Sequence, residues 1–153
     1  MKAHVLTVSD RVSRGTREDT SGALGAHLLT EAGFTVTTAV VPDDADTIRD
    51  ALRAAVSNGE DVVITTGGTG LSPRDVTPEA TTALIERPAP GLADLIRRSG
   101  SVPTAVLSRG VAGVVGRTLV VNLAGSPGAV QEGIGALLPL LPHAIDQLRG
   151  GDH

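Results

Sequence analysis

The chain contains no cysteine, tryptophan or tyrosine, and its 153 residues include one phenylalanine, Phe34, and one lysine, Lys2. The lack of cysteine excludes disulfide bonds, iron–sulfur clusters, thiolate metal sites and cysteine nucleophiles. The scarcity of aromatic side chains argues against base-stacking modules and aromatic cages. A net charge of −4 provides no general attraction to nucleic acid or to an acidic membrane surface. We therefore expect no nucleic-acid or membrane partner.

Long apolar runs are also missing. Residues 1–10 lack the unbroken apolar stretch of a secretory signal, and no segment approaches the roughly 18 apolar residues that a membrane span needs. The chain is 41% hydrophobic and 20% charged, an ordinary mixture for a globular protein. A chain of this length can bury its own core. We expect a single cytoplasmic domain over residues 1–153.

Short β-branched apolar segments alternate with amphipathic helical patterns. The expected strands are residues 3–8, 34–41, 61–66 and 118–123. Thr20 or Ser21 is expected to cap the first helix, and the hydroxyl of Thr77 to cap a later one. Further helices are expected after residue 42 and over residues 91–98. A last helix is expected after the turn at residues 125–128, with its apolar positions running from Val130 to Leu148 and bends at Pro139 and Pro142, whereas residues 102–107 fit a strand or a helix. This alternation predicts an α/β domain with a mostly parallel sheet.

Ligands of such sheets bind outside the carboxyl ends of the strands, so the loops that follow strands are the candidates for function. Residues 65–70, Thr-Thr-Gly-Gly-Thr-Gly, directly follow the third expected strand. Glycines there allow close approach of the backbone to an anion, with N–H groups directed at it. The loop is not a P-loop, which needs a Gly-Lys pair, and Pro73 breaks a dinucleotide fingerprint. A plain strand-to-helix turn is the alternative, but the adjoining Arg74 and Asp75 favour function.

Two carboxylates are expected near this loop. Asp43 follows the second strand, and Asp75 follows the glycine loop. Each could serve only as a turn or capping residue, as we expect of Asp44 and Asp46 at a helix start. Carboxylates from two neighbouring loops beside a phosphate-binding loop nevertheless indicate a Mg²⁺ site, because Mg²⁺ takes one or two carboxylates plus substrate phosphates.

Two further segments are candidates for contact with phosphate. Gly125 and Ser126 precede the last helix, whose N-terminus suits an anion, although Ser126 could equally well only cap that helix. Ser108 and Arg109 could reach a phosphate or form a solvated turn.

Taken together, residues 7–10, 19–22, 65–70, 74–80, 107–109 and 125–128 resemble the MoaB/Mog family of molybdenum cofactor biosynthesis. The match runs in order along nearly the whole chain. The resemblance implies a three-layer αβα fold, a homotrimer or hexamer, and molybdopterin adenylyltransferase activity. In that reaction Mg²⁺-ATP and molybdopterin give adenylylated molybdopterin and pyrophosphate, and the product passes to a molybdate-inserting protein.

The resemblance also assigns roles to residues. Asp43 and Asp75 match two aspartates regarded as essential for adenylylation, and we assign both to catalysis and to Mg²⁺. The positions expected to bind the adenylyl and pterin groups and their phosphates are Thr66, Gly67, Gly68, Thr69, Gly70, Ser108, Arg109, Gly125 and Ser126.

The expected reaction needs no general base, because the attacking terminal phosphate of molybdopterin is already anionic near neutral pH. Catalysis would consist of positioning and charge stabilisation at the α-phosphate of ATP. Two alternatives remain open: a non-catalytic molybdopterin-binding or carrier protein of the same pathway, and a nucleotide pyrophosphatase of related fold.

Overall fold

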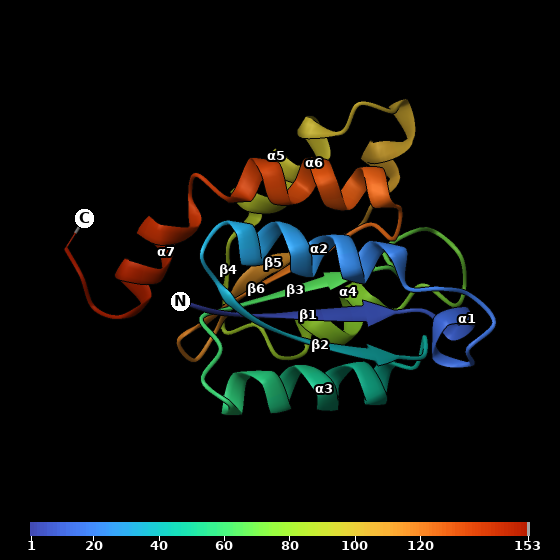
Figure 1. The fold of residues 1–153 in the computed structure, drawn as a ribbon, viewed down its shortest axis with the longest axis horizontal. Coiled ribbons are helices and arrows are strands. Elements are labelled where there is room, and N and C mark those ends of the chain that lie inside the picture. The colour runs from blue at the N-terminus through green and yellow to red at the C-terminus, as the bar shows by residue number, and fades with distance from the viewer. Residues whose placement is uncertain (153) are drawn as a thin grey trace.

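The computed structural model describes residues 1–152, which form one six-stranded sheet with helices on both faces (Figure 1). The strand order is β2-β1-β3-β6-β5-β4. The first four of these are parallel, and the last two join antiparallel. The bounds of the strands are β1 Lys2–Val8, β2 Thr35–Val41, β3 Val62–Thr66, β4 Arg87–Pro88, β5 Ala112–Val115 and β6 Thr118–Leu123.

Seven α-helices and one 3-10 helix lie within the described residues. None of them is long and apolar enough to cross a membrane. Their bounds are α1 Asp10–Ser13, α2 Thr20–Glu31, α3 Ala45–Ser57, α4 Thr77–Thr82, α5 Pro90–Ser99, η1 Pro103–Leu107, α6 Pro127–Leu137 and α7 Leu141–Leu148.

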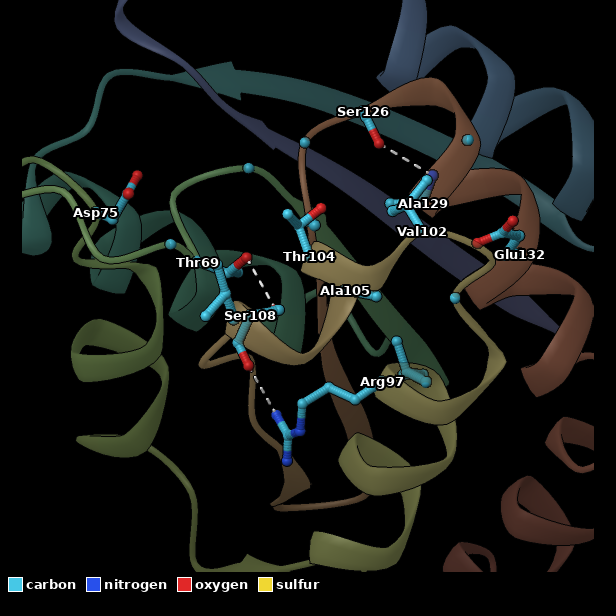
Figure 2. A pocket seen from close by; sticks show the side chains of 18 of the residues that line it. Thr69, Asp75, Arg97, Val102, Thr104, Ala105, Ser108, Ser126, Ala129 and Glu132 are labelled. Carbon is cyan, nitrogen blue, oxygen red and sulfur yellow. Dashed lines mark hydrogen bonds between the residues drawn. The ribbon is translucent and has the colours of Figure 1, made fainter.

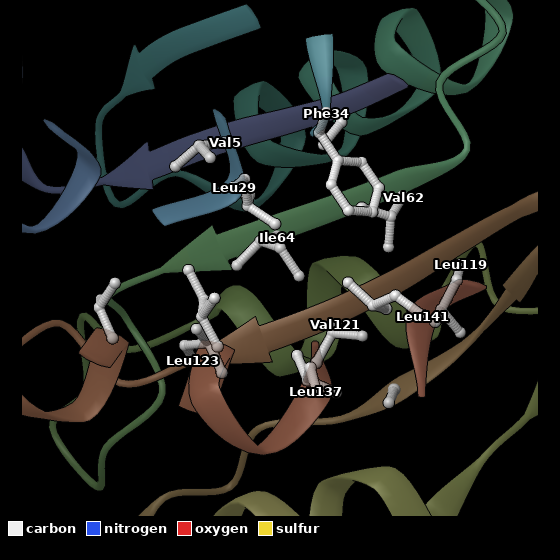
Figure 3. Close-up of a cluster of buried hydrophobic side chains, with 14 of the residues drawn as sticks. Val5, Leu29, Phe34, Val62, Ile64, Leu119, Val121, Leu123, Leu137 and Leu141 are labelled. Atoms are coloured by element: carbon white, nitrogen blue, oxygen red, sulfur yellow. The ribbon is translucent and has the colours of Figure 1, made fainter. Parts of the chain in front are cut away.

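The helices form two outer layers, so the expected three-layer αβα architecture is confirmed. Helices α2, α5, α6 and α7 cover one face of the sheet, and α3 and α4 cover the other (Figure 1). Alternation along β3 shows why both faces are apolar: Val62 and Ile64 enter one core, whereas Val63 enters the other. Figure 3 shows the larger core, where side chains of α2, α6 and α7 pack onto the sheet.

Register sets the position of the functional loops. Val8 pairs with Val41, and Thr66 pairs with both Thr7 and Leu123. Strands β1, β2, β3 and β6 therefore end side by side, and the loops that follow them meet at one edge of the sheet, as the sequence predicts.

The structure corrects several local expectations. Asp19, rather than Thr20 or Ser21, caps α2 by accepting a hydrogen bond from the N–H of Gly22. Thr77 does not cap α4 but is its first residue, and its hydroxyl bonds elsewhere. Residues 102–107, left open between strand and helix, lie largely in η1.

The expected long last helix is two helices. Helix α6 ends at Leu137 and α7 begins at Leu141, because Pro139 lies between them and Pro142 occupies the first turn of α7. The hairpin of β5 and β6 and the short edge strand β4 were not expected from the sequence. The sequence does contain a signal for that hairpin, because Gly116 at φ +61° opens the two-residue turn between β5 and β6.

Candidate active site

The loop after β3 depends on glycine for its shape. Gly67 and Gly68 have φ of +100° and +68°, a region that other residues rarely adopt. A Cβ atom on Gly67 would collide with the carbonyl oxygen of Val8, and one on Gly68 with the hydroxyl of Thr77. At Gly67 and Gly68 the backbone therefore packs directly against β1 and α4, with no room for a side chain.

Every carbonyl group of this loop is bonded inward. The hydroxyl and N–H of Thr77 donate to the carbonyl oxygens of Gly67 and Gly68, at 3.0 and 3.1 Å. The N–H and Nε of Arg109 donate to those of Thr69 and Gly70, both at 2.8 Å.

The N–H groups of the same loop are arranged differently. The N–H of Gly67 donates to the carbonyl of Leu123. Within residues 1–152 the N–H groups of Gly68, Thr69 and Gly70 have no protein acceptor. A loop whose carbonyl oxygens are all occupied and whose N–H groups are free is suited to bind an anion.

Asp43 and Asp75 both lie against this loop. A Cβ atom built on Gly68 would be 3.1 Å from Oδ1 of Asp43, and one on Gly70 would be 2.8 Å from Oδ2 of Asp75. Asp75 also accepts a hydrogen bond from the N–H of Ser72, which fixes the turn between them. The structure thus brings together the two carboxylates that the sequence placed in separate loops.

The electrostatic surroundings of Asp43 include the charge of Asp75. Burial raises the pKa of Asp43 above its ordinary value, and the negative charges of Asp10 and Asp75 add to that rise. A hydrogen bond from the N–H of Asp10 and the charge of Arg74 act in the opposite direction but do not cancel it. A carboxylate held beside others in this way gains stability when a cation approaches.

Asp10 positions Asp43, and the sequence reasoning did not select it. The N–H of Asp10 donates to Oδ2 of Asp43 at 2.9 Å, and the N–H of Asp43 donates to Oδ1 of Asp10 at 3.0 Å. Arg74 donates to the other oxygen of Asp10 from Nη2 at 2.7 Å. Asp10 is therefore neutralised by Arg74, whereas Asp43 faces the loop. Asp10 follows the end of β1 by two positions and lies at the same sheet edge as Asp43. That position in the sequence could have identified Asp10 as a site residue.

A cavity of about 520 Å³ opens beside the glycine loop (Figure 2). Its volume falls within the range of small-molecule sites. Gly67 to Gly70 and Asp75 form one end, Gly125 and Ser126 form one wall, and residues from α5, η1 and α6 complete it. Figure 2 shows Asp75 and Glu132 at opposite ends of the cavity.

A second hollow of about 310 Å³ adjoins the first and shares Gly125 and Ser126 with it, whereas Thr66 lines the second hollow alone. The hydroxyl of Ser126 accepts a hydrogen bond from the N–H of Ala129, so Ser126 does cap α6. It nevertheless lines both hollows, so capping and ligand contact are compatible. The hydroxyl of Ser21 donates to the carbonyl of Gly125 and ties this turn to α2.

Ser108 and Arg109 differ in their placement. Ser108 lines the larger cavity, and its hydroxyl bonds that of Thr69 at 3.1 Å. Arg109 is not among the described residues that line either hollow. Its guanidinium group donates to the carbonyls of Gly70 and Asp75 and to the carboxylate of Glu79. Arg109 in this structure thus fixes the glycine loop by bonding its carbonyl groups and does not line the cavity.

The donor set fits Mg²⁺. Asp43 and Asp75 each keep one oxygen, Oδ1, to which no donor within residues 1–152 is bonded, and carboxylate oxygens are the ligands that Mg²⁺ prefers. No group of three or more His, Asp or Glu side chains that could hold a metal occurs in that part of the chain. These two residues would therefore hold the ion jointly with substrate phosphates, which suits an ion that arrives with a nucleotide.

The fold and this loop cluster are those of a molybdopterin-binding domain. Residues 4–143 match the family described as "Probable molybdopterin binding domain", and the chain belongs to that family. Molybdenum cofactor biosynthesis is the process named for several of its relatives.

Two curated relatives illustrate the match. The chain is 38% identical to the molybdopterin adenylyltransferase of Helicobacter pylori strain J99, with 95% of this chain and 86% of that protein covered. It is 42% identical to the molybdenum cofactor biosynthesis bifunctional protein of Synechococcus elongatus, with 99% of this chain covered. The chain spans about half the length of that bifunctional protein and about a quarter of the cinnamon protein of Drosophila melanogaster.

Solved structures agree. A structure of MogA superposes with a TM-score of 0.93 at 49% identity and covers 97% of this chain and 99% of its own. The MoaB enzyme of Thermus thermophilus gives 0.91 at 48% identity, with 97% and 96% covered.

Proposed function

We propose that this protein catalyses the Mg²⁺-ATP-dependent adenylylation of molybdopterin, with release of pyrophosphate. The observation that carries the proposal is the glycine loop, with three free N–H groups on one side and two carboxylates against it. Free N–H groups bind phosphate oxygens, and the carboxylates suit a metal ion that accompanies a triphosphate. The name of the Helicobacter relative supports the same reaction.

In the proposed reaction the terminal phosphate of molybdopterin attacks the α-phosphorus of ATP, a P–O bond forms, and pyrophosphate leaves. Bound Mg²⁺ would neutralise charge on the phosphates. The chain itself would orient the reacting phosphates through the N–H groups of Gly68, Thr69 and Gly70, and Thr66, Gly67, Ser108, Gly125 and Ser126 would complete their surroundings. No side chain needs to accept a proton, because the attacking oxygen is already anionic.

The proposal extends to assembly and location. We propose a homotrimer or hexamer that works in the cytoplasm, where ATP is available, and passes its product to a molybdate-inserting protein. The exposed apolar residues Val102, Val106 and Leu107 of the η1 segment support a contact with another chain. A mass near 15.5 kDa by light scattering at micromolar concentration would contradict the assembly.

Incubation of the purified protein with Mg²⁺-ATP and molybdopterin tests the reaction. We expect pyrophosphate and adenylylated pterin in equal amounts. Pterin binding without either product would indicate a carrier, and hydrolysis of dinucleotides without pterin binding would indicate a pyrophosphatase.

A further inference from the structure

A charged side chain lies at the end of the cavity far from the phosphate-binding loop. Glu132 of α6 lines the cavity, opposite Asp75 (Figure 2). Its Oε2 accepts a hydrogen bond from the N–H of Ser101 at 3.0 Å, which joins α6 to the segment between α5 and η1. Within residues 1–152 every donor to its carboxylate belongs to Ser101, and no Arg, Lys or His pairs with it.

Arg97 is the one basic residue of the described chain that lines this cavity, and its guanidinium group is already hydrogen-bonded within the fold. Nη1 of Arg97 donates to the carbonyls of Ser108 and Gly110, and Nη2 donates to Asp94. The side chain and N–H of Ser101 hold the pKa of Glu132 below its ordinary value, so its carboxylate is ionised at neutral pH. An ionised carboxylate is an acceptor only, with several lone pairs to fill.

The surroundings of Glu132 suit a flat heterocycle. Ala129 lies one turn before it on the same face of α6, and Val102 and Ala105 of the η1 segment also line the cavity. Small and apolar side chains thus form the walls, and the carboxylate supplies directional polarity at the end. A ring that enters here must present hydrogen-bond donors to Glu132.

We propose that Glu132 recognises the pterin ring of the substrate by accepting hydrogen bonds from its ring N–H and its exocyclic amino group. These two donors lie side by side on the pyrimidine edge of a pterin and match the two oxygens of a carboxylate. Adenine presents a donor beside an acceptor, so a carboxylate would repel half of its edge. The inference rests on the proposed function for the identity of the substrate, and it adds the residue that selects the ring.

The matched variant is Glu132→Gln. Glutamine keeps the shape and can still accept the hydrogen bond from Ser101 through its amide oxygen, but it turns a donor toward the two pterin donors. Asp50→Asn is the charge control, because Asp50 is an exposed carboxylate on α3, on the opposite face of the sheet. Melting temperatures of the three proteins establish that all are folded.

Two probes test the ring contact without turnover. Hydroxymethylpterin has both donors, whereas in the matching lumazine a carbonyl replaces the exocyclic amino group. We expect the unaltered protein and Asp50→Asn to prefer the pterin by about 10- to 100-fold, the range for hydrogen bonds to a charged group. The Glu132→Gln variant should lose that preference and bind ATP unchanged.

Three results would overturn the assignment: no binding of hydroxymethylpterin to the unaltered protein, an undiminished preference in Glu132→Gln, or an equal loss of ATP affinity. Adenylylation assays separate this inference from the proposed function. An active Glu132→Gln enzyme with an unchanged KM for molybdopterin would refute the role of Glu132 alone. Loss of pterin preference in a protein that never forms pyrophosphate would refute only the reaction.

Discussion

An aspartate lies near each end of β3, and the two are in opposite electrostatic situations. Asp61, directly before the strand, accepts a hydrogen bond from the N–H of Lys2, and Nη2 of Arg149 donates to both of its carboxylate oxygens. Burial alone would raise the pKa of Asp61, but these partners outweigh it and hold the pKa below its ordinary value. At the other end, beyond Gly68, the pKa of Asp43 is raised.

The difference distinguishes a structural carboxylate from one that is left for a ligand. Asp61 has its partners within the fold, so its charge stabilises the folded chain. Asp43 and Asp75 both lie against a loop of free N–H groups, an arrangement that favours a bound cation and anion over the empty site. Substitutions at the two ends should therefore separate activity from stability.

The largest effect is expected from Asp43→Asn and Asp75→Asn. Each removes a negative charge from the proposed metal site, and adenylylation should slow by at least ~100-fold, the scale of one preorganised stabilising group. Molybdopterin binding should persist, because that ligand is anionic and gains nothing from the carboxylates. Asp61→Asn is the control and should keep its rate at 25 °C. Near-normal rates in both site variants would refute the metal site.

Gly68→Ala should weaken ATP binding by about tenfold or more and also lower stability. An added methyl group would collide with the hydroxyl of Thr77 and displace the loop. Gly59→Ala is the control: Gly59 has φ +75° with open space around it, so alanine there costs only the left-handed strain of about 1–2 kcal/mol. Equal ATP affinity in both variants, measured by calorimetry, would exclude backbone binding by this loop.

Arg149→Ala should lower the melting temperature by about 2–4 °C at pH 7, the shift for about 1 kcal/mol in a chain of this size. Because the folded pKa of Asp61 is depressed, its stabilising effect is present above the unfolded pKa and is lost as pH falls through the folded pKa. The difference between variant and unaltered protein should therefore shrink in acid. A difference that stays constant from pH 7 down to about pH 3 would contradict the ion-pair explanation.

The smallest effect is expected from Arg74→Ala. Arg74 is exposed, and its charge lowers the pKa of both Asp10 and Asp43. Its loss should raise the pKa of Asp43 further, so the acid side of the pH–rate profile should move to higher pH. At pH 8 the rate should stay within about fivefold, as for an exposed ion pair. An acid side that moves to lower pH would show that Arg74 does not act through Asp43.

The sequence predicts the parallel strands and their loops well because each parallel strand is a short run rich in β-branched and other apolar residues. It therefore also places Asp43, Asp75 and the glycine loop at one edge. The sequence does not predict the short strands β4 and β5. Strand β4 has only two residues and β5 contains a glycine, so neither shows such a pattern.

Capping and pairing were harder to foresee. Asp19 and Thr20 are both good caps, and only the structure shows that Asp19 bonds the N–H of Gly22. The role of Arg109 depends on contacts 30 to 39 residues away in sequence. Hydrogen bonds between residues so far apart in the chain produce no local sequence pattern from which they could be predicted.

The inward bonding of all four carbonyl groups of the glycine loop has a kinetic consequence. A loop anchored in this way has little conformational freedom left to lose when a phosphate arrives. Capture of the phosphate should then be a single step, whose rate rises linearly with nucleotide concentration and depends on ionic strength. Stopped-flow traces should show no slow isomerisation after encounter, in contrast to enzymes whose phosphate loops close over the ligand.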